Sequence, residues 1–240
     1  MMDKRAILNG LRRGEIDLQG QFLRGSNGTF LVIVQNQDHS IQAVYKPEAG
    51  EQPLWDFPVG TLGKRELATY LFDEALEWEL VPPTIYRKEA PLGPGSLQFF
   101  IPHDPENHYF QLSPSHEDTL QKVLLFDFML NNADRKAGHF ILDADNHIWL
   151  IDHGLTFNAI DKLRTVAWDH AGENIPPELL TKIKGVHDGL ETKDEIYLQL
   201  SSLLSMSELT ALSDRMKTLL KNGCYPIPPS DRRVIPWPPI

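Results

Sequence analysis

Over the first hundred residues, apolar positions fall in short runs that predict strands. Phe30 to Val34 is a continuous apolar run typical of a buried strand, and Ile41 to Lys46 alternates clearly enough to be its antiparallel partner. Leu97 to Ile101 predicts a further short strand. One helix is expected in this part, because apolar residues recur at helical spacing between positions 67 and 78 and the run ends before Pro82 and Pro83.

Beyond residue 104, helical periodicity dominates. Ser115 and the acidic residue three positions later can cap a helix whose apolar face leads the chain to Asp134. Residues 176–222 follow a helical pattern interrupted by a capping box that begins at Ser205. The Pro-rich tail, residues 225–240, is expected to be extended and packed on the body, since a free tail would expose several large apolar groups.

This order, strands around one helix and then helices around one hairpin, predicts an α+β, two-lobed protein fold with a cleft between the lobes. We expect residues 1–240 to form one domain. It would have an N-lobe of about 1–100, a hinge of about 99–103, a C-lobe of about 104–224 and the tail 225–240.

Composition narrows the classes of function. The net charge of −10 and the lack of a run of Lys or Arg argue against nucleic-acid binding and leave peripheral membrane contact without support. No apolar run approaches the roughly 20 residues that a membrane span requires, and the first residues lack the apolar centre of a secretory signal. Cys224 is the single cysteine, so we expect a reducing, cytoplasmic location.

The most informative stretch surrounds two acidic residues, Asp134 and Asp152. Between them, His139 to Leu142 and His147 to Ile151 read as two short strands joined by a polar turn over residues 143–146. A hairpin of this length brings its ends together, so both aspartates and the histidine that opens the hairpin are expected at one rim.

Paired carboxylates beside a cation are what phosphoryl transfer requires. Asp134 would orient the attacking hydroxyl, unless it is a loop residue bonded to nearby backbone N–H groups, and Lys136 would offset charge on the moving phosphate. Arg135 could equally be a structural anchor. Asp152 ends a buried strand, where a carboxylate is costly unless paired, so we favour a metal ligand there. His139 is either a further ligand or a packed residue, because Mg²⁺ prefers oxygen.

Two features of the first hundred residues have both a structural and a functional interpretation. Lys46 ends a predicted strand and Glu66 borders the apolar face of the predicted helix, an arrangement that can direct an ammonium group at nucleotide phosphates. An isolated lysine there would simply be a surface residue. Residues 25–29, including Ser26, Asn27 and Gly28, form either a plain hairpin turn or a cover whose backbone N–H groups approach phosphates.

Taken together, these motifs resemble the phosphatidylinositol 3/4-kinase-like branch of the protein-kinase-like fold, nearest to type II phosphatidylinositol 4-kinases and to a bacterial branch assigned to that group. The resemblance covers about residues 18–170 and rests on five motifs in matching order: Val44–Pro47, Arg65–Leu71, Val81–Thr84, Asn132–Arg135 and Ile151–Phe157. The bacterial branch is also similar in Leu163–Asp169 and in the ending Ile235–Pro239.

The resemblance implies an ATP-binding site that uses Mg²⁺ or Mn²⁺. Lys46 would contact the nucleotide phosphates and Glu66 would hold Lys46. Phe100 and Ile101, in the strand that reaches the hinge, would contact adenine. In the lipid kinases, a second metal ligand, Asn, follows the catalytic Asp by five residues, and here His139 takes that place. That difference implies either a preference for Mn²⁺ or a weaker second metal site.

The leading hypothesis is therefore an ATP- and metal-dependent kinase that phosphorylates a hydroxyl-bearing acceptor, which is a lipid, a protein or a small molecule. The alternative is a nucleotide-binding pseudokinase that acts as a switch or scaffold, suggested by His139 and by the weak glycine signature. A third hypothesis is transfer of AMP or another nucleotide fragment.

Overall fold

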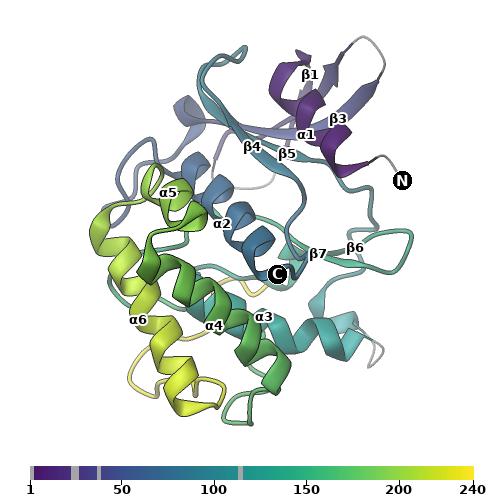
Figure 1. The fold of residues 1–240 in the computed structure, drawn as a ribbon. Coiled ribbons are helices and arrows are strands. Elements are labelled where there is room, and N and C mark those ends of the chain that lie inside the picture. Colours follow the sequence, from purple (N-terminus) through teal and green to yellow (C-terminus); the bar gives the residue numbers. More distant parts are fainter. Residues whose placement is uncertain (1–2, 23–26, 37–38, 113–115) are drawn as a thin grey trace.

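The computed structural model describes residues 3–22, 27–36, 39–112 and 116–240, and they form two lobes: an antiparallel sheet with one helix on it, and a larger helical body (Figure 1). The strands are β1 (Glu15–Gln21), β2 (Phe30–Gln35), β3 (Ser40–Pro47), β4 (Thr84–Arg87), β5 (Gly95–Phe99), β6 (Phe140–Leu142) and β7 (Ile148–Leu150). The α-helices are α1 (Lys4–Arg13), α2 (Leu62–Leu76), α3 (Glu117–Leu130), α4 (Pro177–Thr192), α5 (Glu195–Ser201) and α6 (Met206–Asn222). The two-lobed α+β prediction is confirmed.

The sheet of the first lobe has the strand order β1-β2-β3-β5-β4, and each neighbouring pair is antiparallel. β2 and β3 coincide with the two strands that the apolar pattern predicts, although Gln37 and Asp38 of the turn between them lie outside the described residues. The register places Lys46 of β3 opposite Ser96 of β5. The face of the sheet that packs on α1 carries a small core. Lys46, at the end of β3, contacts Glu66 of α2 and Asp152 of the second lobe.

The helix α1 corrects the expectation of a single helix in the first hundred residues. Ile7 and Leu11 lie one turn apart on this helix and are buried against the sheet. The apolar residues of this helix share one face, so the sequence carries a helical period there that the sequence interpretation missed. Packing on the sheet stabilises a helix this short. The capping interaction proposed for Ser115 lies outside the described residues; α3 begins at Glu117.

The second lobe contains the larger core. Helices α3, α4, α5 and α6 contribute to it, and so does α2, whose Phe72 and Leu76 are fully buried there. The capping box of Ser205 and Glu208 starts α6 as predicted, and Gly223 ends this helix with a left-handed backbone (φ 65°). Within the described ranges, each helix is too short or too polar to span a bilayer.

The tail packs on the second lobe, and hydrogen bonds contribute to this packing. The carbonyl of Val234 accepts bonds from the Thr165 N–H (2.9 Å) and the Trp168 indole (3.2 Å). The carbonyl of Pro239 accepts the Ala137 N–H at 2.7 Å. Trp237 remains 74% exposed. Side chains contribute too: Tyr225 is buried in the larger core, and Arg232 donates to both carboxylate oxygens of Asp161 and to the carbonyl of Leu163, each at 2.8 Å. Main-chain and side-chain contacts together hold the tail, while several large apolar side chains stay at the surface.

Candidate functional site

A cavity opens where the sheet, α2 and the segments after α3 and β7 meet. Lys46, Glu66, Asp134 and Asp152, which lie far apart in the sequence, all line it. The other lining residues are Asn27, Gly28, Pro47, Glu51, Leu62, Gly63, Gly154 and Leu155. Both lobes thus contribute polar groups to one enclosed space.

Lys46 lies at the centre of this cavity. Its Nζ bonds to Oε1 of Glu66, which is 2% exposed, and lies 3.0 Å from Oδ1 of Asp152. Burial alone would lower the pKa of Lys46, but the charges of Asp152 and Glu66 outweigh it and raise the pKa above its usual value. The ammonium group is therefore permanently charged and held between the two lobes.

Asp134 lies in the loop that follows α3. Asn131 ends that helix with a left-handed backbone (φ 52°), and the Asp134 N–H then bonds to Oδ1 of Asn132 at 3.0 Å. Oδ2 of Asp134 lies 3.4 Å from Nζ of Lys136. Burial raises the pKa of Asp134, and the charge of Lys136 opposes that shift. A partly buried carboxylate with a raised pKa is suited to accept a proton from a hydroxyl group.

A buried ion pair holds this loop in place. Arg135 is fully buried, and its Nε contacts both carboxylate oxygens of Asp127 at 3.0 and 3.2 Å. Asn132 and Thr165 also donate to Asp127, at 3.0 and 2.8 Å. Arg135 Nη1 donates to the carbonyl of Ile151 at 3.0 Å and so connects the loop to the end of β7. Of the two roles considered for Arg135, the contacts favour the structural anchor.

Asp127 is a site residue that the sequence interpretation missed. It is fully buried on α3 within the run Val123 to Leu130, which is otherwise apolar or aromatic. A single charge in such a run is the available signal, because a buried carboxylate needs a partner. Its partner, eight residues further on in a loop, could not be identified from helical spacing.

His139 and Asp152 meet across the hairpin, as the sequence predicts. Nε2 of His139 lies 3.5 Å from Oδ2 of Asp152, and the Lys136 N–H points to Nδ1 of the same ring at 3.4 Å. Burial lowers the pKa of His139 to about 4, so the ring is neutral at pH 7. The charge of Lys46 is the largest cause that holds the pKa of Asp152 far below its usual range. Asp152 itself has a left-handed backbone (φ 62°).

The donor set near Asp152 fits a divalent cation that completes its coordination with a ligand. Across the described ranges, no group of three or more His, Cys, Asp or Glu side chains is arranged to hold a metal ion by itself. Mg²⁺ is commonly held by one or two carboxylates together with substrate phosphates. Asp152 and, within the same cavity, Asp134 offer such carboxylates, and His139 offers a nitrogen.

The turn before β2 closes one side of the cavity. Ser26 lies outside the described residues, whereas Asn27 and Gly28 line the cavity. The Gly28 N–H bonds to the carbonyl of Gly50 at 2.8 Å, and Oδ1 of Asn27 accepts the Gln52 N–H at 2.8 Å. A Cβ on Gly50 would lie 2.9 Å from the Gly28 carbonyl oxygen, so the two segments approach as closely as only glycine allows.

Glu51 lines the cavity and is another residue that the sequence interpretation missed. Its carboxylate accepts the N–H groups of Gly60, Leu62 and Gly63 at 2.9 to 3.3 Å, at the start of α2. Burial raises the pKa of Glu51, and these backbone bonds oppose the shift. The residue lies in a loop punctuated by Pro and Gly, where no periodic pattern identifies it.

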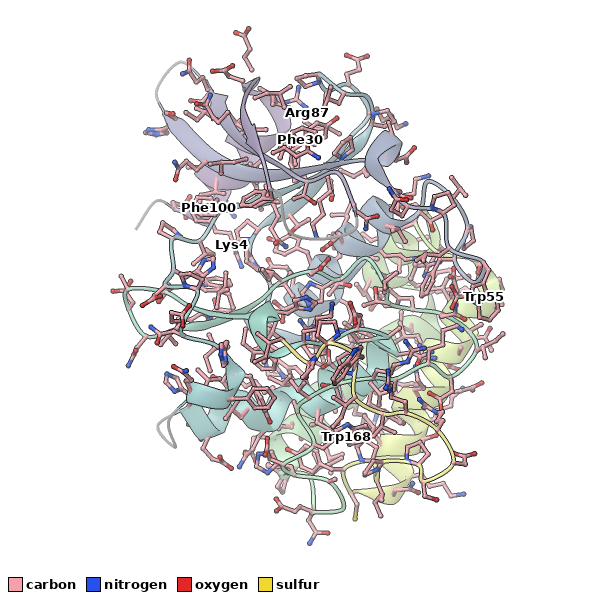
Figure 2. All side chains as sticks on the ribbon, turned by 180° about the vertical axis from the view of Figure 1, so that it is seen from behind. Lys4, Phe30, Trp55, Arg87, Phe100 and Trp168 are labelled. Atoms are coloured by element: carbon pink, nitrogen blue, oxygen red, sulfur yellow. The ribbon has the colours of Figure 1, made fainter. Side chains whose placement is uncertain are left out.

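Phe100 and Ile101 follow β5 directly but are not among the residues that line the cavity. The Phe100 N–H bonds to the Gln42 carbonyl at 3.0 Å, and the Ile101 side chain is buried. In Figure 2, Phe100 and Trp55 lie at opposite edges of the molecule. The predicted contact of Phe100 and Ile101 with adenine stays a prediction.

No protein-family model matches the sequence. A relative with substantial identity is Protein Rv2133c of Mycobacterium tuberculosis (strain ATCC 25618 / H37Rv). It is 35% identical over 271 residues, and the alignment covers 98% of this chain and 95% of the relative.

Several solved structures share the arrangement of lobes. The Golgi casein kinase matches with a TM-score of 0.53 and 14% identity over 92% of this chain and 75% of that one. Its structure with Mn/ADP bound matches with a TM-score of 0.55 and 15% identity over 91% and 74% of the two chains. The Helicobacter pylori proinflammatory kinase CtkA matches with a TM-score of 0.54 and 12% identity over 90% and 94%. At such low identity, these similarities show a common fold.

Proposed function

This chain belongs to the family of Protein Rv2133c and has a protein-kinase-like fold, and from that premise we propose that it is an ATP- and divalent-metal-dependent phosphotransferase with an alcohol acceptor. One observation carries the proposal. Lys46, on a strand, is held by Glu66, on a helix. Both line one cavity together with Asp134 and Asp152 of the other lobe.

Each polar group then has a role. Lys46, held by Glu66, would contact the nucleotide phosphates, and Asn27 and Gly28, with Ser26 before them, would cover these phosphates. Asp134 would accept the proton of the acceptor hydroxyl, with Lys136 offsetting phosphate charge. We assign Phe100 and Ile101 to adenine contact, within the proposed hinge of about 99–103 that follows β5.

A divalent cation, Mg²⁺ or Mn²⁺, would be held by Asp152 and His139, and when bound it supplies positive charge to the phosphates. The structure of the Golgi casein kinase with Mn/ADP supports nucleotide and metal as cofactors. Closer kinship with phosphatidylinositol 3/4-kinases is part of the proposal, and it leaves lipid, protein and small-molecule acceptors open.

A second candidate is a nucleotide-binding pseudokinase, and the contacts of His139 favour it. Because the Lys136 N–H points to Nδ1, the neutral ring carries its proton on Nε2, which faces Asp152. Binding a metal through Nε2 would require the other tautomer and would release the Lys136 bond. This would weaken the second metal position and leave binding without turnover.

The test compares Asp134→Ala with the wild type and with Asp145→Ala, which removes an exposed carboxylate from the turn between β6 and β7. ATP turnover with Mg²⁺ or Mn²⁺ should fall about 10²–10⁴-fold in Asp134→Ala, while ATP binding by calorimetry and the Asp145→Ala activity stay near wild type.

Wild-type protein that binds ATP but shows no turnover with either metal would contradict the kinase and support the pseudokinase. In that case Lys46→Ala should still remove the thermal shift that ATP produces. Mass spectrometry of the incubated protein separates phosphate transfer from AMP transfer by the added mass.

A further inference from the structure

We infer that Arg65 is a positioning residue, which, together with Glu208, clamps α2 to the helical lobe and keeps Glu66 in contact with Lys46 before any nucleotide binds. The clamp concerns how the site is assembled. Its effect on turnover rests on the proposed function, whereas its effect on the position of α2 does not.

Arg65 joins three segments that are distant in the sequence. Its side chain is 2% exposed, and Nη1 donates to the carbonyl of Thr156 at 2.6 Å, four residues beyond Asp152. Nη2 bonds to Oε1 of Glu208, 143 residues away on α6. The guanidinium also lies 5.0 Å from the centre of the Phe57 ring. A planar group that is buried with several acceptors fixes its position more tightly than one contact does.

Glu208 uses its two carboxylate oxygens for different purposes. Oε1 meets Arg65, while Oε2 accepts the N–H and the hydroxyl of Ser205, both at 2.8 Å, in the capping box of α6. Burial alone would raise the pKa of Glu208, but the Ser205 N–H bond and the charge of Arg65 together lower it. Glu208 is therefore ionised and itself held by the end of a helix.

The clamp acts on Glu66 because the two residues are adjacent on one helix. The α2 helix lies against the helical lobe in Figure 1, and its apolar side chains belong to the larger core. Oγ1 of Thr69 lies 3.3 Å from Oγ1 of Thr156, and a Cβ on Gly154 would lie 3.3 Å from Cβ of Leu62. A shift of α2 away from this lobe would break the Arg65 contacts together with this close packing.

The helix α2 packs on β4 and β5 of the sheet as well as on α4 and α5, and the Arg65 contacts add a polar attachment to the helical lobe. Glu66 is thereby held relative to Asp134 and Asp152, and Lys46 reaches it from the sheet. A misplacement of about 1 Å in such a group can cost about a hundredfold in rate. Arg65 thus acts on turnover through Glu66, without contacting the phosphates.

The experiment compares Glu208→Ala with Ser205→Ala, both at the start of α6. Ser205→Ala removes part of the helix cap and leaves the Arg65 contact, whereas Glu208→Ala removes both. Hydrogen exchange over residues 62–70 should lose protection in Glu208→Ala and stay near wild type in Ser205→Ala. With ATP and metal, kcat should fall about ten- to hundredfold in Glu208→Ala, with KM changed less than about threefold.

Glu208→Gln provides the rescue, because its amide oxygen still accepts from Arg65, and it should restore most of the protection and of kcat. Equal effects of Glu208→Ala and Ser205→Ala, in proportion to their loss of stability in urea, would overturn the clamp. If the wild type shows no turnover, and only Glu208→Ala loses protection from hydrogen exchange, the phosphotransferase is refuted and the clamp is kept. Full turnover together with unchanged hydrogen exchange in Glu208→Ala would refute the clamp and keep the phosphotransferase.

Discussion

The two walls of the cavity are built in different ways. On the helical side, Asp134 lies in a loop that the fully buried pair Asp127 and Arg135 fixes, with Arg135 Nε contacting both carboxylate oxygens. On the sheet side, Asn27 and Gly28 meet the segment around Gly50 through two hydrogen bonds. From this difference we expect the helical wall to be the more rigid of the two and the sheet wall to be the more easily displaced.

The energies of the two kinds of contact support this contrast. Removing one partner of a buried ion pair costs about 3–5 kcal/mol, because the other charge is left without compensation. A typical hydrogen bond contributes only about 0.5–1.5 kcal/mol net. Disrupting the helical wall is therefore expected to destabilise the whole fold, whereas disrupting the sheet wall should leave the rest of the fold intact.

The largest effect is expected from Asp127→Ala. This variant leaves the Arg135 guanidinium buried without its carboxylate and also removes the acceptor of Asn132 and Thr165. We expect a loss of about 3–5 kcal/mol in the free energy of unfolding, measured by urea denaturation, and loss of turnover. A loss below about 1 kcal/mol would show that the helical wall does not depend on this pair.

Asp73 sharpens the comparison, because it is a buried carboxylate that bonds only to backbone. It accepts the N–H groups of Leu80 and Val81, both at 2.9 Å, and burial raises its pKa to about 7. Between about pH 4 and 7 the folded chain keeps a proton that the unfolded chain releases, so this residue makes stability fall as the pH rises.

The slope from Asp73 reaches about 1.4 kcal/mol per pH unit and ends above pH 7. Asp73→Asn keeps an oxygen for the two N–H groups and has no proton to lose, so its stability should vary less over this range. Urea midpoints from pH 4.5 to 7.5 measure the difference. Parallel curves for variant and wild type would contradict the shift.

The smallest effect on stability is expected at the sheet wall, from Gly50→Ala. The new Cβ would lie 2.9 Å from the Gly28 carbonyl oxygen, so the segments around Gly28 and Gly50 must separate. We expect at most about 1 kcal/mol of destabilisation and a several-fold weaker affinity for ATP by calorimetry. Gly20→Ala in β1 is the control, because its Cβ would meet nothing within 4 Å. Equal affinities for the two variants would contradict the role of the sheet wall.

Much of the fold could be predicted because its patterns are local. The strands β2 and β3, the hairpin after Asp134 and the capping box of Ser205 each have a period or a turn signal within a few residues. The helix α1 was missed although Ile7, Leu8 and Leu11 recur at helical spacing within its ten residues.

The contacts that support the site could not be predicted in the same way. Arg65 and Glu208 are 143 residues apart, and nothing near either residue indicates the other. Glu51 lies in an irregular loop, and its role depends on where α2 begins. Sequence patterns thus identified Lys46, Glu66, Asp134 and Asp152, which line the cavity, whereas Glu51 and the groups behind the cavity depend on tertiary packing.

The tail illustrates a form of dependence that substitution experiments overlook. Because Val234 and Pro239 meet the loops beside Asp134 through main-chain carbonyls, replacing their side chains leaves the acceptors in place. A scan of single substitutions would therefore score Val234 and Pro239 as tolerant, and drift at these two positions over evolution would look neutral. Shortening the chain before Val234 would reveal that a stretch so permissive in composition supports the geometry of the site.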